Sequence, residues 1–396
     1  MIVVVGAGPA GIAAALHVVA RGARVRVLDD NPAPGGQIWR GEYRFPDLAI
    51  EFIPSASVVA AEASTRTLLA ETPAGAMEIR YDKLILATGA RELFLPFPGW
   101  TLPGVMGAGG LQALAKGGLP LRHKRVVVAG SGPLLLAAAA YFRKCGAQVS
   151  LIAEQASLVS VAPFAARKPW QALGLQLELL GIPYRFACYP VKAEGTKRAE
   201  RVWFRAGSRT FAEEVDYAAI SWGLHPNTEL AQVLGCRCEG AVQTDDFQRT
   251  SEPDIYAAGE MTGIGGVDLS RIEGAIAGCA AVGEEAAARG LFAERAKARD
   301  RARCLNRAFA LNPALRRLPR PDTIVCRCED VPLARLCAAA SFREARLHTR
   351  CGMGPCQGRI CGPAAEFLFG WSDSSIRIPV LSAHTATLIC SSATKG

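Results

Sequence analysis

The chain has 396 residues, 50% of them hydrophobic and 20% charged, with a formal net charge of +9. This composition is typical of a globular enzyme and excludes a disordered or fibrous chain, and at roughly 150 residues per domain the length predicts two or three domains. The basic residues are scattered except in the runs 295–307 and 316–320, which we interpret as a solvated helix and linker.

We therefore predict no nucleic-acid partner, with an acidic protein surface as the alternative use of the positive charge. No stretch is apolar over the roughly 20 residues that a membrane helix needs, so we also predict no transmembrane segment. The apolar start 1–5 lacks the basic region of a signal peptide and leads straight into a glycine motif, so we expect a cytoplasmic protein. Disulfides do not explain 13 cysteines in a reducing compartment, so clustered cysteines indicate metal or redox use.

The first motif predicts a strand, a glycine turn and a helix, because residues 3–11 read VVVGAGPAG and an alanine-rich segment follows. Gly6 permits the tight turn, Gly8 lets the backbone approach a pyrophosphate, and Gly11 lets the helix pack closely on the strand. The motif, which includes Pro9 and Ala10, opens a helix expected over 12–20, and the free N–H groups and positive dipole end at its N-terminus attract phosphates.

An acid and three further motifs favour FAD over NAD at this site. Asp29 ends the second strand, 24–28, where a carboxylate can hold the ribose hydroxyls. Further candidate contacts lie in a loop after this acid and in the small-residue turns that end two later strands, 81–89 and 254–260; they are Gly36, Gln37, Thr88, Gly89, Gly259 and Glu260. This set resembles FAD-binding proteins of the pyridine-nucleotide-disulfide oxidoreductase type. They usually carry aspartate where Glu260 stands, so contact between the longer Glu260 and the ribityl chain is an open question.

A second copy of the pattern occurs at 126–134, VVVAGSGPL, followed by a helix over 134–145 and a strand over 148–152. Gly130 and Gly132 match the first two glycines, but Leu135 replaces the third, and we expect it to push the helix away from the strand. Glu154 closes the second strand and can hold an NAD ribose, whereas it would repel the 2′-phosphate of NADP. Binding of NAD or another adenine nucleotide, and a structural domain that has lost its ligand, are both open.

These elements predict an α/β protein with two nested Rossmann-like dinucleotide-binding domains and a small helical C-terminal domain. The boundaries that we expect are an FAD-binding domain at 1–105 and 240–285, an inserted NAD-type domain at 106–239, a connector at 286–320, a cysteine domain at 321–370 and an irregular tail at 371–396.

The cysteine segment reads CRC at 326–328 and TRCGMGPCQGRIC at 349–361. Four thiolates from glycine-containing loops fit an iron–sulfur cluster, and zinc accepts the same ligands. The string resembles the 2Fe–2S domain of bacterioferritin-associated ferredoxins (BFD-like). That resemblance implies four ligands and makes Cys351 a spare thiol or alternative ligand; the four are Cys326, Cys328, Cys356 and Cys361. No CxxC pair follows the first glycine motif, which argues against a disulfide reductase.

Over nearly its whole length the chain resembles the α subunits of heteromeric FAD-dependent amino-acid and opine dehydrogenases. The motifs that carry the resemblance are VGAGPAG at 5–11, PGGQIWR at 34–40, GLHPNTEL at 223–230, DIYAAGE at 254–260 and the cysteine segment. The resemblance implies an electron-transfer subunit with FAD, a 2Fe–2S cluster and, in some members, an FMN at a subunit interface.

The same resemblance implies that a β subunit, which is an FAD protein of the amine-oxidase or DAO type, oxidises the substrate. It also implies that a further partner is a small ferredoxin-like subunit. The substrate would be an opine, D-hydroxyproline, proline, sarcosine or glycine. We assign no catalytic residue, because the sequence offers no convincing general base or amine-recognition set. Two alternatives are open: an NAD(P)H-dependent flavin oxidoreductase that feeds a partner through its cluster, and an assembly scaffold with vestigial nucleotide sites.

Overall fold

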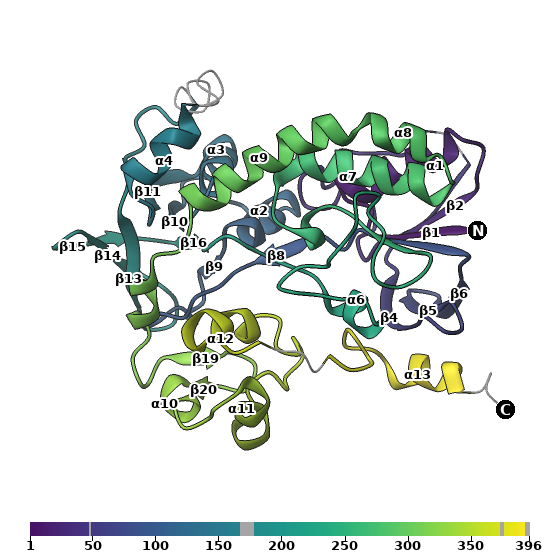
Figure 1. Ribbon diagram of the computed structural model, residues 1–396. Helices are drawn as coiled ribbons and strands as arrows, with labels where there is room; N and C mark the ends of the chain where they lie inside the picture. The colour runs from purple at the N-terminus through teal and green to yellow at the C-terminus, as the bar shows by residue number, and fades with distance from the viewer. Residues whose placement is uncertain (47–48, 167–177, 373–375, 393–396) are drawn as a thin grey trace. The chain divides into compact units, whose positions relative to one another are not determined.

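The computed structural model describes residues 1–46, 49–166, 178–372 and 376–392 (Figure 1). The chain forms two compact units, each built from separate segments of sequence. The first contains Met1–Arg91, Pro226–Arg303 and Ser375–Gly396, and the second contains Glu92–His225 and Cys304–Ser374. The chain enters the second unit through β8 (Ala90–Glu92) and returns through β17 (Leu224–Pro226), which pair in a two-stranded ribbon.

The first unit is built on a five-stranded parallel sheet. In spatial order its strands are β18 (Ile255–Ala257), β7 (Lys83–Leu86), β1 (Ile2–Val5), β2 (Val25–Leu28) and β3 (Ile50–Ile53). All four residues of β1 are buried because both faces of the sheet are covered. Val3 and Val5 pack in one core, and Ile2 and Val4 pack in another.

Two layers provide those cores. The layer against Val3 and Val5 includes the antiparallel sheet of β4 (Ser57–Glu62), β5 (Thr67–Thr72) and β6 (Gly75–Arg80) and the helix α6 (Glu229–Val233). The opposite layer contains α1 (Pro9–Val19) and α7 (Gly266–Ala281). These helices lie in close contact, because a Cβ on Gly274 would be 2.0 Å from the Ala10 carbonyl oxygen. The unit also contains η1 (Glu260–Thr262), α8 (Glu285–Gly290) and most of α9 (Phe292–Ala308).

The second unit repeats the plan, which confirms the predicted α/β fold with a second Rossmann-like sheet. Its parallel strands, in spatial order, are β12 (Tyr184–Arg185), β11 (Gln148–Glu154), β10 (Arg125–Gly130), β16 (Tyr217–Ser221) and β9 (Val105–Gly107). An antiparallel sheet follows in β13 (Cys188–Glu194), β14 (Arg201–Ala206) and β15 (Arg209–Glu214), and the helices are α2 (Ala108–Lys116), α3 (Leu134–Lys144) and α4 (Leu158–Ala165). Leu135 is fully buried in the core that α3 shares with Val126 and Val128.

The cysteine segment forms a small subdomain of the second unit with its own core around Val325, Leu336 and Phe342. Before it, η2 (Pro313–Arg317) packs its Leu315 into the core that includes Val127. The elements of the subdomain are β19 (Ile324–Cys326), β20 (Val331–Pro332), α10 (Leu333–Leu336), α11 (Phe342–Thr349) and α12 (Cys361–Phe369). The indole N–H of Trp100 donates to the Ile324 carbonyl at 2.6 Å, which ties the subdomain to the segment that follows β8.

The units differ from the expected boundaries at both crossings and at the tail. Residues 92–105 pack with the second unit, and residues 226–239 pack with the first. The tail, expected to be irregular, contains α13 (Thr385–Ser392), while its residues 373–375 and 393–396 lie outside the described residues. It packs on the first unit because the Val380 N–H donates to the Val59 carbonyl at 2.7 Å, and Thr387 donates to Glu71 at 2.8 Å. Within the described ranges, no helix has the length and apolarity needed to cross a bilayer.

Candidate functional site

The first glycine turn leaves no room for side chains at its two ends. A Cβ on Gly6, whose φ is +104°, would lie 2.2 Å from the Ala87 carbonyl oxygen, and one on Gly11 would lie 1.8 Å from the Gly6 carbonyl oxygen. Both glycines therefore lie directly against neighbouring backbone, as the tight βαβ turn requires.

Gly8 is different, because a Cβ there would meet no atom within 4 Å. The loop after the acid folds against this turn: the Gly35 N–H donates to the Ala7 carbonyl at 2.8 Å, and a Cβ on Gly36 would lie 3.0 Å from the Gly8 Cα. The space beside Gly8, at the start of α1, therefore forms a cradle bordered by two loops, which is what a pyrophosphate needs. Gln37, in the same loop, is exposed and accepts from Arg40 at 2.9 Å.

Asp29 sits at the end of β2 and is only 6% exposed. One carboxylate oxygen accepts from the Ala7 N–H at 2.5 Å, and the other accepts from the backbone N–H and side-chain amide of Asn31 at 2.8 and 2.7 Å. The acid thus fixes the glycine turn, and the oxygen that faces Ala7 has a further lone pair that can accept from a ribose hydroxyl.

Thr88 and Gly89 are held by Asn227, a residue that the sequence interpretation did not single out. The Thr88 hydroxyl donates to the Asn227 carbonyl at 2.8 Å, the Asn227 amide donates to the Thr88 carbonyl at 2.9 Å, and the Asn227 N–H donates to the Gly89 carbonyl at 3.0 Å. Arg91 then binds Glu229 at 2.7 Å. The motif GLHPNTEL at 223–230 was the signal for this clasp, since it contains both Asn227 and Glu229.

Glu260 presents one satisfied and one unsatisfied oxygen. Its Oε1 accepts from the Gly266 N–H at 2.7 Å, whereas its Oε2 is buried and has no hydrogen-bond partner among the described residues. Burial, reinforced by nearby Glu273, raises the pKa of this carboxyl. A buried acceptor without a donor is costly, and a ribityl hydroxyl of FAD would satisfy it. The longer side chain therefore fits the flavin role expected of this position.

Glu273 on α7 is a second residue that the sequence did not reveal. It is 2% exposed, and its Oε2 accepts from the Gly259 N–H at 3.2 Å and from the Thr262 hydroxyl at 2.9 Å. Arg299 on α9 donates to its Oε1 at 3.0 Å. These bonds fix the turn that carries Gly259 and Glu260.

The basic run on α9 is therefore not the fully solvated face that we expected. Arg295 is buried and donates to Asp246 at 2.6 Å. Arg299 contacts the turn that carries Gly259 and Glu260 through Glu273. The missed signal was the spacing of Arg295, Ala298, Arg299 and Ala302, which places two arginines among buried alanines on one helix face.

In the second unit, the glycine turn is equally tight, and backbone N–H groups bind both oxygens of its acid. A Cβ on Gly130 would lie 1.8 Å from the Ser221 carbonyl oxygen. Glu154 is 0% exposed, and its two oxygens accept from the Gly132 and Ala156 N–H groups, each at 2.8 Å. Burial raises the pKa of Glu154 to about 7. Glu154 thus fixes its own glycine turn, as Asp29 does in the first unit.

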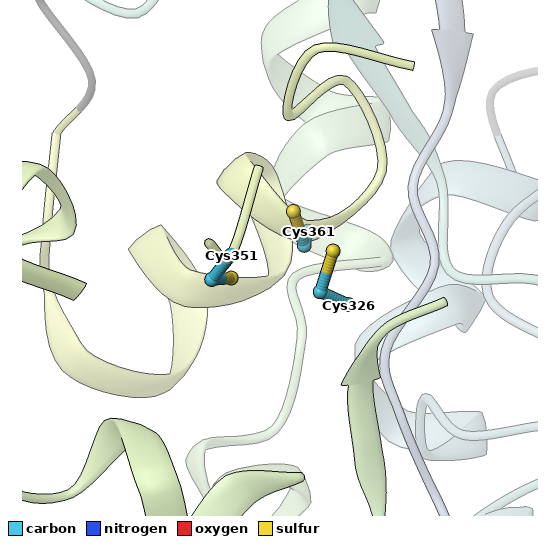
Figure 2. A group of neighbouring side chains, drawn as sticks. All are labelled: Cys326, Cys351 and Cys361. Atoms are coloured by element: carbon cyan, nitrogen blue, oxygen red, sulfur yellow. The ribbon is translucent and has the colours of Figure 1, made fainter. Parts of the chain in front are cut away.

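Three cysteines converge in the subdomain. The sulfur atoms of Cys326, Cys351 and Cys361, all buried, lie within 4.8 Å of one another (Figure 2). They come from the end of β19, the turn after α11 and the first residue of α12. Hydrogen bonds from the Cys351 and Cys361 thiols lower the pKa of Cys326, and the Gly352 N–H points at its sulfur at 3.5 Å. N–H groups directed at sulfur are a feature of iron–sulfur sites.

The four expected ligands also share a cleft of about 120 Å³, whose other lining residues include Phe94, Trp100 and Ile360. Cys328 is exposed and Cys356 is half-buried at this cleft. We call the five residues the cysteine centre; they are Cys326, Cys328, Cys351, Cys356 and Cys361. The structure therefore brings the expected spare, Cys351, into contact with two of the expected ligands. Five thiols in this arrangement fit a 2Fe–2S cluster and also fit zinc.

Comparison with known proteins places the chain in a family. Residues 1–277 match the pyridine nucleotide-disulphide oxidoreductase family. An opine oxidase subunit of Rhizobium meliloti is 32% identical over 91% of this chain and 80% of its own length. The hydrogen cyanide synthase subunit HcnB of Pseudomonas protegens is 30% identical over 91% of this chain and 89% of its own.

Among solved structures, L-proline dehydrogenase from P. horikoshii superimposes with a TM-score of 0.67 over 98% of this chain and 78% of that one, at 20% identity. That likeness concerns the fold alone. The family and the sequence relatives confirm the resemblance found in the motifs and support binding of FAD or NAD(P). The chain belongs to the pyridine nucleotide-disulphide oxidoreductase family, among the relatives of HcnB and of the opine oxidase subunit, and is an FAD-dependent oxidoreductase.

Proposed function

We propose that this chain is the electron-transfer subunit of a heteromeric amino-acid or amine dehydrogenase, with FAD in its first unit and a 2Fe–2S cluster in its second. The cysteine centre carries the proposal. Three of its thiols are buried within 4.8 Å of one another, and two of these three, Cys326 and Cys361, line a cleft together with Cys328 and Cys356, so these four would form the metal-ligating set. Thiolates in glycine turns are typical cluster ligands, and a cluster in the same chain as a flavin domain is suited to passing electrons one at a time.

The residues of the first unit would hold FAD at three points. The cradle beside Gly8 would take the pyrophosphate, Asp29 would accept from the ribose, and the free Oε2 of Glu260 would accept from a ribityl hydroxyl. Bound FAD supplies the exchange of one or two electrons. The hydrogen bonds between Thr88 and Asn227 would keep the turn at Thr88 and Gly89 rigid.

The names of the relatives support a protein complex in which separate subunits oxidise the substrate and transfer the electrons. Two of them are named as subunits, of opine oxidase and of hydrogen cyanide synthase. We infer that a β flavoprotein of the amine-oxidase or DAO type oxidises an opine, D-hydroxyproline, proline, sarcosine or glycine and delivers electrons to this chain. An FMN at the interface and a small ferredoxin-like subunit fit the same scheme. The chain itself would position cofactors and set their potentials.

The test is to purify the chain without oxygen, alone and with a co-expressed β flavoprotein encoded beside it. FAD, iron and labile sulfide are measured per chain, with EPR of the reduced protein and turnover of the five candidate substrates. We expect FAD, about two irons per chain by analogy with 2Fe–2S proteins, and turnover only in the complex. Zinc without sulfide would exclude the electron relay, and robust amine oxidation by the isolated chain would exclude the division of labour.

A further inference from the structure

The connector that follows α9 lies across the second nucleotide turn. We call residues 309–312 the strap. The Ser131 hydroxyl donates to the Phe309 carbonyl at 3.0 Å, and the Gln155 amide donates to the Ala310 carbonyl at 3.1 Å. The Gln155 amide oxygen accepts in turn from the Asn312 N–H at 3.1 Å. These hydrogen bonds join the strap to the ends of β10 and β11.

The two side chains that bind the strap are buried and hydrogen-bonded, whereas Ala310 and Asn312 of the strap are exposed. Ser131 is 2% exposed and Gln155 is 4% exposed, and the Gln155 amide also donates to the Ser131 hydroxyl at 3.0 Å. The Phe309 ring packs edge-on against Phe164 at 5.8 Å between centroids. The far end of the strap is fixed because the Asn312 side chain accepts from the Ala314 N–H at 2.9 Å and so begins η2. Such a contact costs free energy to open, since it leaves buried polar groups unpaired.

The strap covers the edge that a dinucleotide would use. In a Rossmann-like domain, the phosphates lie on the glycine turn and the adenosine ribose meets the acid at the end of the second strand. Here backbone N–H groups engage both oxygens of that acid, Glu154, as they do those of Asp29 in the first unit, so the two units differ at the residue that follows. The next residue, Gln155, binds the strap. In the first unit, the residue after the acid is Asp30, which is exposed.

We propose that the strap is the permanent occupant of the ribose-binding edge of the second unit and excludes pyridine dinucleotides from it. The second Rossmann-like sheet then serves as the platform to which the cysteine subdomain is attached. NADH is consequently not an electron donor to this chain, which leaves the partner flavoprotein as the source of electrons. The inference stands on the second unit alone and does not depend on the identity of the metal in the cysteine centre.

The experiment uses the full chain loaded with FAD, so that the first site is filled. NADH and NAD⁺ are titrated by calorimetry, and flavin reduction by NADH is followed without oxygen. The variant Gln155→Ala/Phe309→Ala removes two of the side chains that hold the strap and leaves the Ser131 hydroxyl, which belongs to the glycine turn, in place. The matched control, Gln148→Ala, changes an exposed glutamine at the opposite end of the same strand.

We expect no binding by the wild type or the control up to about 1 mM, a free energy of about −4 kcal/mol, and at least tenfold tighter binding by the strap variant. Micromolar NADH binding or flavin reduction by NADH in the wild type would overturn the proposal, and this arm needs no mutation. A folded strap variant, judged by its FAD content and circular dichroism, that binds NADH no better than the wild type would overturn it as well.

Discussion

Replacing Glu273 with alanine tests how the turn that carries Gly259 and Glu260 is held. Three donors lose their acceptor, but they do not suffer equally. The Thr262 hydroxyl keeps the Gly259 carbonyl at 2.8 Å. Arg299 keeps Gln248 at 3.3 Å and is 39% exposed, so water can solvate it. Only the Gly259 N–H is left buried and unpaired.

The orphaned N–H costs about 2 kcal/mol, and the cavity left by the aliphatic part of the side chain adds about 1 kcal/mol. We therefore expect Glu273→Ala to lower the free energy of unfolding by about 3 kcal/mol, combining these two losses. Glu273→Gln keeps an oxygen for Gly259 but turns its amide NH2 toward Arg299, which then relies on Gln248 and water; for a partly exposed arginine this costs about 1 kcal/mol.

Urea unfolding of the FAD-loaded protein gives these differences, and FAD retained after gel filtration reports on the turn. The exposed Glu294→Ala on α9 is the control and should stay within about 0.5 kcal/mol of the wild type. The reasoning fails if Glu273→Ala matches this control in both stability and FAD retention, or if the glutamine variant is as damaged as the alanine variant.

Three further predictions concern the nucleotide turns and the cysteine centre. Gly8→Leu should abolish FAD retention, because its side chain would fill the cradle; unchanged FAD content would refute the site. Among single alanine variants of the cysteine centre, only Cys351→Ala should keep iron and sulfide, because Cys351 does not line the shared cleft. Loss of iron in Cys351→Ala with retention in Cys328→Ala would instead favour Cys326, Cys351 and Cys361 as ligands. Glu154→Gln should remove a pH dependence of stability. The pKa of Glu154 is raised from 4.5 to about 7 in the folded wild type, so the folded state holds the proton more tightly than the unfolded state. The stability of the wild type therefore falls by up to about 3 kcal/mol as pH rises from 4.5 to 7 and stays level above pH 7. Parallel pH profiles for variant and wild type would contradict that origin.

The sequence by itself determined the βαβ start of each parallel sheet and the class of nucleotide cofactor, since these depend on local patterns. A β-branched run, a glycine turn and an alanine-rich helix specify a βαβ start whatever surrounds them, and the Gly11 Cα approaches backbone that the same motif supplies. The cysteine spacing likewise predicted that thiols gather in this segment, and the structure brings three of them within 4.8 Å of one another.

Only the tertiary structure decided which residues secure those sites, because the partners are far apart in the chain. Glu273 meets Arg299 through the packing of α7 and α9, and Asn227 meets Thr88 only after the chain has built most of the second unit and returned. Gln155 meets the strap across a comparable separation in sequence. A single sequence carries no periodic signal for such contacts, because they depend on where whole elements pack. The ends of two similar glycine turns therefore look alike in sequence and differ in what covers them.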